Sequence, residues 1–127
     1  MSNIYHISTR AALNSARQEG SYRTASLSSE GFIHFSQLHQ VMGVANAFYK
    51  GQQELVILVV DPKLLKAELK YEPPVHPGGA SQNATMPTAE QKFPHLYGSL
   101  NIDAIISEVD LLPLNDGSFV LPPALSS

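Results

Sequence analysis

The feature of this sequence that most constrains its fold is an unbroken apolar run at residues 55–60, Leu-Val-Ile-Leu-Val-Val. A run of this length that is rich in β-branched side chains predicts a central strand buried on both faces. Asp61 and Pro62 follow it directly and end the strand. We therefore expect other elements to pack against both faces of this strand.

Shorter elements are expected on either side of it. Further strands are predicted at residues 4–7, 32–35, 69–72, 102–106, 109–112 and 119–121. Ser8 or Thr9 begins a helix that Gly20 ends, and Ser36 begins a second that Gly51 ends. The second helix carries an apolar stripe with helical spacing, typical of a core-facing surface: Leu38, Val41, Met42, Ala45, Phe48 and Tyr49.

This element order predicts an α+β fold. We expect a compact single domain over residues 1–127, with a core at about 3–122, a split mixed or antiparallel sheet and two main helices. Residues 21–31 are predicted to be a loop, and the tail after Pro123 to be loose. Residues 73–92 are rich in proline and glycine and are either a mobile linker or a loop that closes over a ligand.

Composition excludes several classes of protein. The chain has no cysteine, so a disulfide scaffold, a thiol nucleophile and a cysteine zinc site are excluded. No apolar stretch approaches the roughly 18 residues of a membrane span. The net charge of −3 argues against a general nucleic-acid coat protein. The first residues contain no secretion signal, so we expect a cytoplasmic protein.

The charges are unevenly placed along the chain. Residues 1–50 carry a net charge of +2 and residues 51–127 carry −5. All three arginines of the chain lie in the first 23 residues, at Arg10, Arg17 and Arg23. Arginine matches the geometry of phosphate and carboxylate groups. We therefore expect an anion site in the first half, with Arg10 or Arg23 at the phosphate.

Two histidines share a local pattern. His6 in Ile-Tyr-His-Ile-Ser and His34 in Phe-Ile-His-Phe-Ser each lie in a predicted strand, two residues before a serine. If the two strands pair, both imidazoles point into one cleft. Imidazole suits hydrogen bonding to ribose hydroxyls or acid–base transfer. The alternative is that both rings are satisfied by backbone partners in a half-buried sheet.

A third histidine, His95, lies in Phe-Pro-His-Leu-Tyr-Gly, an extended or turn segment after the long loop. His95 and Tyr97 would form a wall of the site, or else Phe93 and Tyr97 would fill the core. His6, His34 and His95 lack the helical spacing of a metal-ligand pair, so no metal is expected. Their candidate role is catalytic, with Thr9, Arg10, Arg23, Ser36 and Tyr97 as the candidate substrate-binding residues.

Four motifs in order resemble one family. They are Tyr-His-Ile-Ser-Thr at 5–9, Gly-Phe-Ile-His-Phe-Ser at 31–36, Val-Asp-Pro at 60–62 and Phe-Pro-His-Leu-Tyr-Gly at 93–98. Together they resemble the bacterial domain-of-unknown-function family DUF952, from Ile4 to about Pro122. The resemblance implies no established activity.

A more distant resemblance links the chain to ADP-ribosyltransferases and RNA 2′-phosphotransferases. Tyr5-His6 followed by Thr9 is similar to the first-strand motif of the transferases, and the order from Ile33 to Asp61 is similar to that of the phosphotransferases. The resemblance implies an ADP-ribosyltransferase-like fold that binds NAD, with His6 on a ribose hydroxyl. No acidic residue occupies the position of the transferases' catalytic glutamate.

Several functions remain open at this point. The first is an enzyme that binds NAD, ADP-ribose or a phosphorylated ribose between His6, His34 and His95, with transferase activity. The second is a binding module without turnover that uses the same residues. The third is a two-histidine phosphoesterase, which needs duplicated lobes, for which the spacing of 28 positions from His6 to His34 is too short. The last is a protein-interaction domain whose histidines belong to the core.

Overall fold

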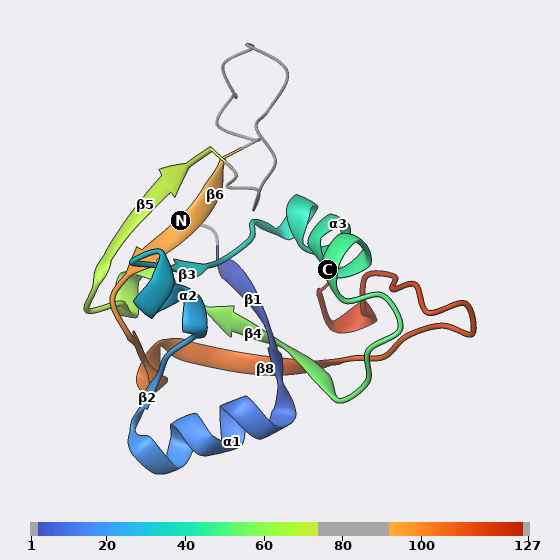
Figure 1. The fold of residues 1–127 in the computed structure, drawn as a ribbon, viewed down its shortest axis with the longest axis horizontal. Coiled ribbons are helices and arrows are strands. Elements are labelled where there is room, and N and C mark those ends of the chain that lie inside the picture. The colour runs from blue at the N-terminus through green and yellow to red at the C-terminus, as the bar shows by residue number, and fades with distance from the viewer. Residues whose placement is uncertain (1–2, 74–91, 126–127) are drawn as a thin grey trace.

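The computed structural model describes residues 3–73 and 92–125. An antiparallel three-stranded sheet lies at its centre (Figure 1). Its strands are β1 (Ile4–Thr9), β4 (Leu55–Val60) and β8 (Ile105–Leu111), with β4 in the middle. The strand predicted from the apolar run is thus the central strand of this sheet.

Strand β4 is buried along its whole length. Val56, Leu58 and Val60 belong to one hydrophobic cluster, and the alternate residues of the strand belong to a second. Because side chains alternate across a strand, the two clusters lie on opposite faces of the sheet. The prediction of a strand buried on both faces is confirmed.

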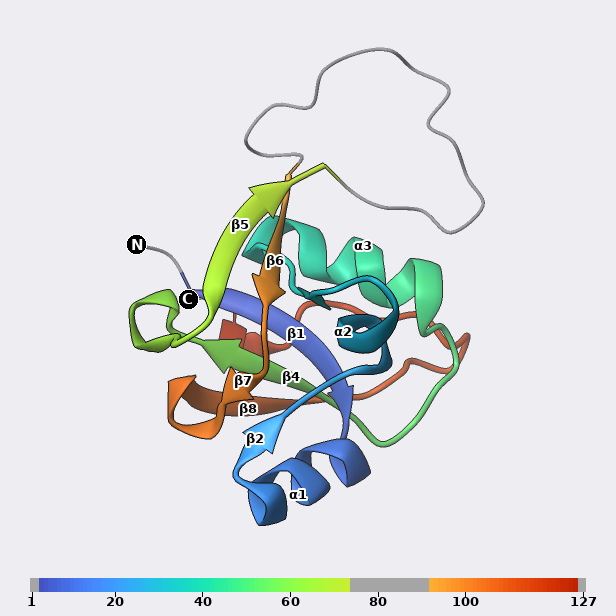
Figure 2. The ribbon, with the colours of Figure 1, turned by 60° about the vertical axis from the view of Figure 1, so that its left-hand side comes forward.

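One helix packs into each cluster, and in both views the two helices lie at opposite ends of the molecule (Figures 1 and 2). Helix α1 (Arg10–Glu19) begins at Thr9, whose side chain accepts a hydrogen bond from the amide of Ala12. It ends at Gly20, whose φ of 88° lies in the left-handed region that favours glycine. Its buried residues are Leu13 and Ala16.

Helix α3 (Leu38–Phe48) buries only the middle of its predicted stripe. Val41 and Ala45 are buried against the sheet, and Met42 and Tyr49 pack at their margin. Leu38 and Phe48 are exposed, which corrects the prediction for the two ends of the stripe. The helix contacts the sheet through its middle turns, so Leu38 and Phe48 lie beyond the area of contact.

Two smaller antiparallel sheets complete the fold (Figure 2). In the first, β2 (Ser21–Tyr22) pairs with β7 (Leu100–Asn101). In the second, β6 (Phe93–Tyr97) lies between β3 (Ile33–His34) and β5 (Glu68–Glu72). Every pairing among the described strands is antiparallel, so the fold is α+β with three small sheets rather than one mixed sheet.

Some local predictions were wrong. The expected loop at 21–31 contains β2 and a short helix, α2 (Ala25–Ser29). The two strands expected at 102–112 form the single strand β8, preceded by a 3₁₀ turn at Ile102–Ala104. Residues 119–121 form no strand, and the tail after Pro123 is not loose as far as Leu125, which is buried in the core in a turn at Pro123–Leu125.

The proline- and glycine-rich segment at 73–92 is described only at its ends. Its residues 74–91, and with them the choice between a linker and a ligand-closing loop, lie outside the described residues. A 3₁₀ turn at Pro62–Leu64 follows β4. Among the described helices, none has the length and apolar character needed to cross a membrane.

Candidate functional site

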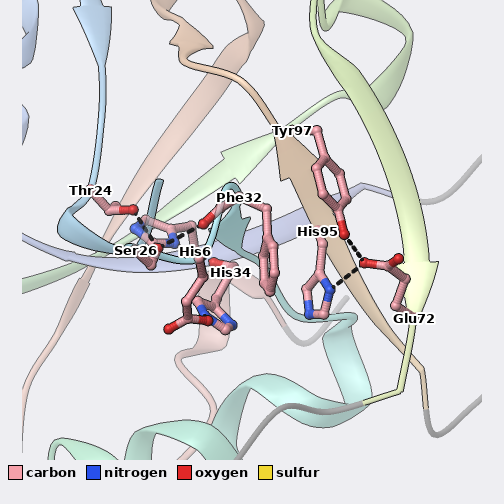
Figure 3. A network of polar contacts seen from close by, with 9 residues as sticks. His6, Thr24, Ser26, Phe32, His34, Glu72, His95 and Tyr97 are labelled. Carbon is pink, nitrogen blue, oxygen red and sulfur yellow. Dashed lines mark hydrogen bonds and ion pairs between the residues drawn. The ribbon is translucent and has the colours of Figure 1, made fainter. Parts of the chain in front are cut away.

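The candidate site lies on one face of the sheet β3-β6-β5. His34 and His95 are direct partners in the register of β3 and β6, and Lys70 of β5 lies opposite His95 on the other side. Residues two positions apart on a strand share a face. Phe32, Tyr97 and Glu72 therefore lie on the same face as the two histidines, and we call these five residues the histidine face (Figure 3).

His95 is held by a carboxylate from the neighbouring strand. Its Nδ1 lies 2.9 Å from Oε1 of Glu72, and the hydroxyl of Tyr97 donates to the same oxygen at 2.5 Å (Figure 3). Both hydrogen bonds lower the pKa of the Glu72 carboxyl, that of Tyr97 the more. Because a carboxylate only accepts hydrogen bonds, Nδ1 of His95 carries a proton.

The other ring nitrogen of His95 is not paired. The residue is 1% exposed, and its Nε2 is buried without a hydrogen-bond partner among the described residues. Burial lowers the pKa of His95 below its usual value, although the bond to Glu72 opposes this. The ring is therefore neutral at pH 7, with the lone pair of Nε2 available as an acceptor. Most buried polar atoms have a partner, so this nitrogen requires an explanation.

Aromatic contacts surround the ring of His95. The ring of Phe32 is stacked on it with a centroid distance of 4.1 Å and also contacts the ring of His34 at 4.8 Å. The rings of His34 and His95 lie edge to face, 5.4 Å apart. His34 is half-exposed, and its Nε2 lies 2.9 Å from a carboxylate oxygen of Glu30. The ring of Phe32 thus contacts the histidine of both pairs, His95–Glu72 and His34–Glu30.

His6 occupies a different environment. Its Nδ1 donates to the backbone oxygen of His34 at 2.6 Å, and its Nε2 is hydrogen bonded to the hydroxyl of Tyr22 at 2.9 Å. Burial lowers the pKa of His6 to about 4. Both ring nitrogens are occupied within the fold, so His6 fixes the backbone of β3 beneath the histidine face.

The two strands with the shared histidine pattern do not pair as a ladder. β1 pairs with β4, while β3 pairs with β6. Two contacts link the segments: a bridge in which Tyr5 and Ser36 exchange two backbone hydrogen bonds of 2.8 and 2.7 Å, and the bond from His6 to the His34 backbone oxygen. His34 therefore faces His95, and the cleft expected between His6 and His34 is not formed by paired strands.

The remaining predicted substrate-binding residues are dispersed. Thr9 caps α1 at the far end of β1, and Arg10 forms an ion pair with Asp110 of β8. Arg23 is exposed between β2 and α2, and Ser36 is buried at the bridge to Tyr5. Of this group, only Tyr97 belongs to the histidine face.

Sequence reasoning missed both glutamates of the site. Glu72 is 23 positions from His95 in the sequence, and only the register of β5 and β6 brings them together. Glu30 is four positions before His34, but it follows α2, which the sequence did not predict. Within the described ranges, no three histidine, aspartate or glutamate side chains are grouped as a metal site requires.

Comparison with known proteins places the chain in a family. The model described as "Protein of unknown function (DUF952)" matches residues 7–108. The chain belongs to this family. The resemblance seen in the four motifs is thereby confirmed. A comparison with curated proteins finds none that matches.

Solved structures of one bacterial protein resemble this chain along nearly its whole length. Two crystal structures of protein CC0527 from Caulobacter crescentus, one of them a double mutant, have a TM-score of 0.79 and 31% identity. Each match covers 99% of this chain and 100% of that chain. A solution NMR structure of CC0527 has a TM-score of 0.65 and 32% identity over 93% of this chain and 91% of that one.

Proposed function

We propose that the histidine face binds a nucleotide or another phosphorylated ribose, with NAD and ADP-ribose as the ligands to test. A ribose hydroxyl of the ligand donates a hydrogen bond to Nε2 of His95. The observation that carries this proposal is the buried Nε2, which has no partner among the described residues while Nδ1 is held by Glu72. An unpaired buried acceptor costs about 1–3 kcal/mol, and a ligand hydroxyl would remove that cost.

The arrangement also suits proton transfer. Glu72 fixes the orientation and the tautomer of His95, as a carboxylate does for a catalytic histidine. A neutral imidazole with an open Nε2 accepts a proton from a hydroxyl within hydrogen-bond reach. His34, half-exposed and beside Glu30, would face the phosphate of the ligand.

Access to Nε2 requires movement. His95 is only 1% exposed, and Phe32 is stacked on its ring. A ligand therefore reaches the nitrogen only after the covering side chains shift. Gly31, which precedes Phe32, has a φ of 93°, a conformation that other residues rarely adopt. We propose that Phe32 moves when the ligand enters.

The choice of ligand rests on the likeness to ADP-ribosyltransferases, and an ADP-ribosyltransferase-like fold is part of the proposal. The Tyr5-His6 motif with Thr9 supports it. In this proposal His6 positions β3 through its bond to the His34 carbonyl. Of the two arginines expected at the phosphate, Arg10 is paired with Asp110, and Arg23 is exposed but lies outside the histidine face.

Binding without turnover is the second candidate. Cleavage of the nicotinamide–ribose bond needs stabilisation of a cation-like transition state, for which carboxylates serve in glycosidases. Glu72 already accepts hydrogen bonds from His95 and Tyr97, so its charge is partly engaged. Release of nicotinamide from NAD would identify a transferase, and binding without release would identify a binding module.

Calorimetric titration tests the proposal. Wild-type protein, His95→Gln and the control His39→Gln, an exposed histidine of α3, are titrated at pH 7.5 with NAD, ADP-ribose and ribose 5-phosphate. We expect binding of at least one ligand, weakened about tenfold or more in His95→Gln and unchanged in His39→Gln. No heat from any ligand with folded protein, or equal affinity in His95→Gln, contradicts the proposal.

A further inference from the structure

We infer that Tyr97 is a positioning residue of this site, because its hydroxyl tunes the basicity of His95 through the one oxygen of Glu72 that both side chains contact. This inference rests on the proposed function for the role of His95. It assigns Tyr97 no contact with the ligand, which departs from the expectation that Tyr97 binds substrate.

The geometry of the shared oxygen carries the inference. Oε1 of Glu72 accepts from the Tyr97 hydroxyl at 2.5 Å and from Nδ1 of His95 at 2.9 Å. A short donor on a carboxylate oxygen draws negative charge toward itself. Less charge then remains to stabilise a protonated His95. Tyr97 thereby favours the neutral ring whose Nε2 accepts a hydrogen bond.

Other charged groups face this cluster. The Nζ atom of Lys70 lies 5.0 Å from the centre of the Tyr97 ring, and Glu68 acts on the phenol from the same strand. On the other side, His34 lowers and Glu30 raises the pKa of His95 by their charges. All four groups remain when only the hydroxyl of Tyr97 is removed, so that change isolates its effect.

An NMR titration of the His95 ring, without ligand, tests the inference. Tyr97→Phe is compared with wild type and with Tyr71→Phe, which removes a hydroxyl from an exposed residue of the same sheet on the opposite face. We expect the pKa of His95 to rise by roughly half a unit to one unit in Tyr97→Phe, because Glu72 then bonds to His95 alone. Tyr71→Phe should leave it unchanged.

A double mutant identifies the path of the effect. In the Glu72→Gln background, Tyr97→Phe should cause no further change in the pKa of His95, because the shared carboxylate is gone. An unchanged or lower pKa in folded Tyr97→Phe overturns the inference. An equal rise in the Glu72→Gln background also overturns it, since Tyr97 would then act by another route.

Wild-type protein provides a second measurement if Tyr97→Phe does not fold. The ¹³Cζ resonance of Tyr97 must shift as the Glu72 carboxyl titrates at acid pH, and the absence of such a step overturns the inference. These titrations contain no ligand. Failure to bind any nucleotide therefore contradicts the proposed function alone, whereas an unresponsive His95 contradicts the role of Tyr97 alone.

Discussion

At the scale of single residues, the candidate histidines differ in what their ring nitrogens contact. His6 has both nitrogens bonded within the fold, at the His34 carbonyl and the Tyr22 hydroxyl. His95 has one nitrogen on Glu72 and one without a described partner. The sequence identified the residues, but only the partners separate a structural histidine from a candidate catalytic one.

The pH dependence of stability tests the assignment of His6. Its pKa is about 4 in the folded protein, against an ordinary value near 6.5. The unfolded chain therefore binds more protons between these values, and stability is lost as pH falls from about 6.5 to about 4. The expected loss from His6 is about 3 kcal/mol.

Urea unfolding from pH 7.5 to 4 measures this loss. His95, whose pKa is also lowered by burial, adds a loss of the same sign. We therefore expect His6→Gln to be less stable than wild type at pH 7.5 and to show a shallower decline as the pH falls. An identical pH dependence in wild type and His6→Gln shows that His6 is not buried in the neutral form.

At the scale of elements, the sequence alone predicted those helices and strands whose signal lies within their own residues. The apolar run of β4 and the cap and stop residues of α1 predicted those elements. Short elements without such a signal were missed, namely the two-residue β2 and the Ser-rich α2. At Phe119, expected in a strand, the side-chain amide of Asn46 on α3 takes both backbone hydrogen bonds that a neighbouring strand would have taken.

Substitutions in β4 test burial on both faces. Ile57 and Leu58 are each 0% exposed and belong to different clusters. Changing either to alanine should lower the free energy of unfolding by about 2–5 kcal/mol. The control Ile106→Ala, on the exposed part of β8, should cost less than about 1 kcal/mol. Urea denaturation measures these free energies of unfolding. If Ile57→Ala or Leu58→Ala costs no more than the control, β4 is not buried on both faces.

At the scale of the whole molecule, the charges that are separated along the sequence meet in space. Arg10 and Arg17 of the positive first half form ion pairs with Asp110 and Glu108 of β8. The expectation of an anion site at Arg10 rested on its position in the sequence, which gave no sign of this pairing. These pairs are largely exposed and contribute little to stability.

The histidine face is likewise a property of the whole fold. Its residues come from three segments, around position 32, at position 72 and at positions 95–97. The sequence indicated His34, His95 and Tyr97 from local patterns. It could not indicate Glu72, because the relation of Glu72 to His95 exists only in the register between β5 and β6. The pairing of the Glu72 carboxylate with His95, the candidate base, could therefore be found only in the structure.

The tautomer of His95 in the folded protein is the most direct test of the central claim. The ¹⁵N resonances of the imidazole ring, recorded at pH 7.5 without ligand, report which nitrogen carries the proton. We predict a neutral ring with the proton on Nδ1, bonded to Glu72, and an unprotonated Nε2. A proton on Nε2, in either the other neutral tautomer or an imidazolium, would contradict it.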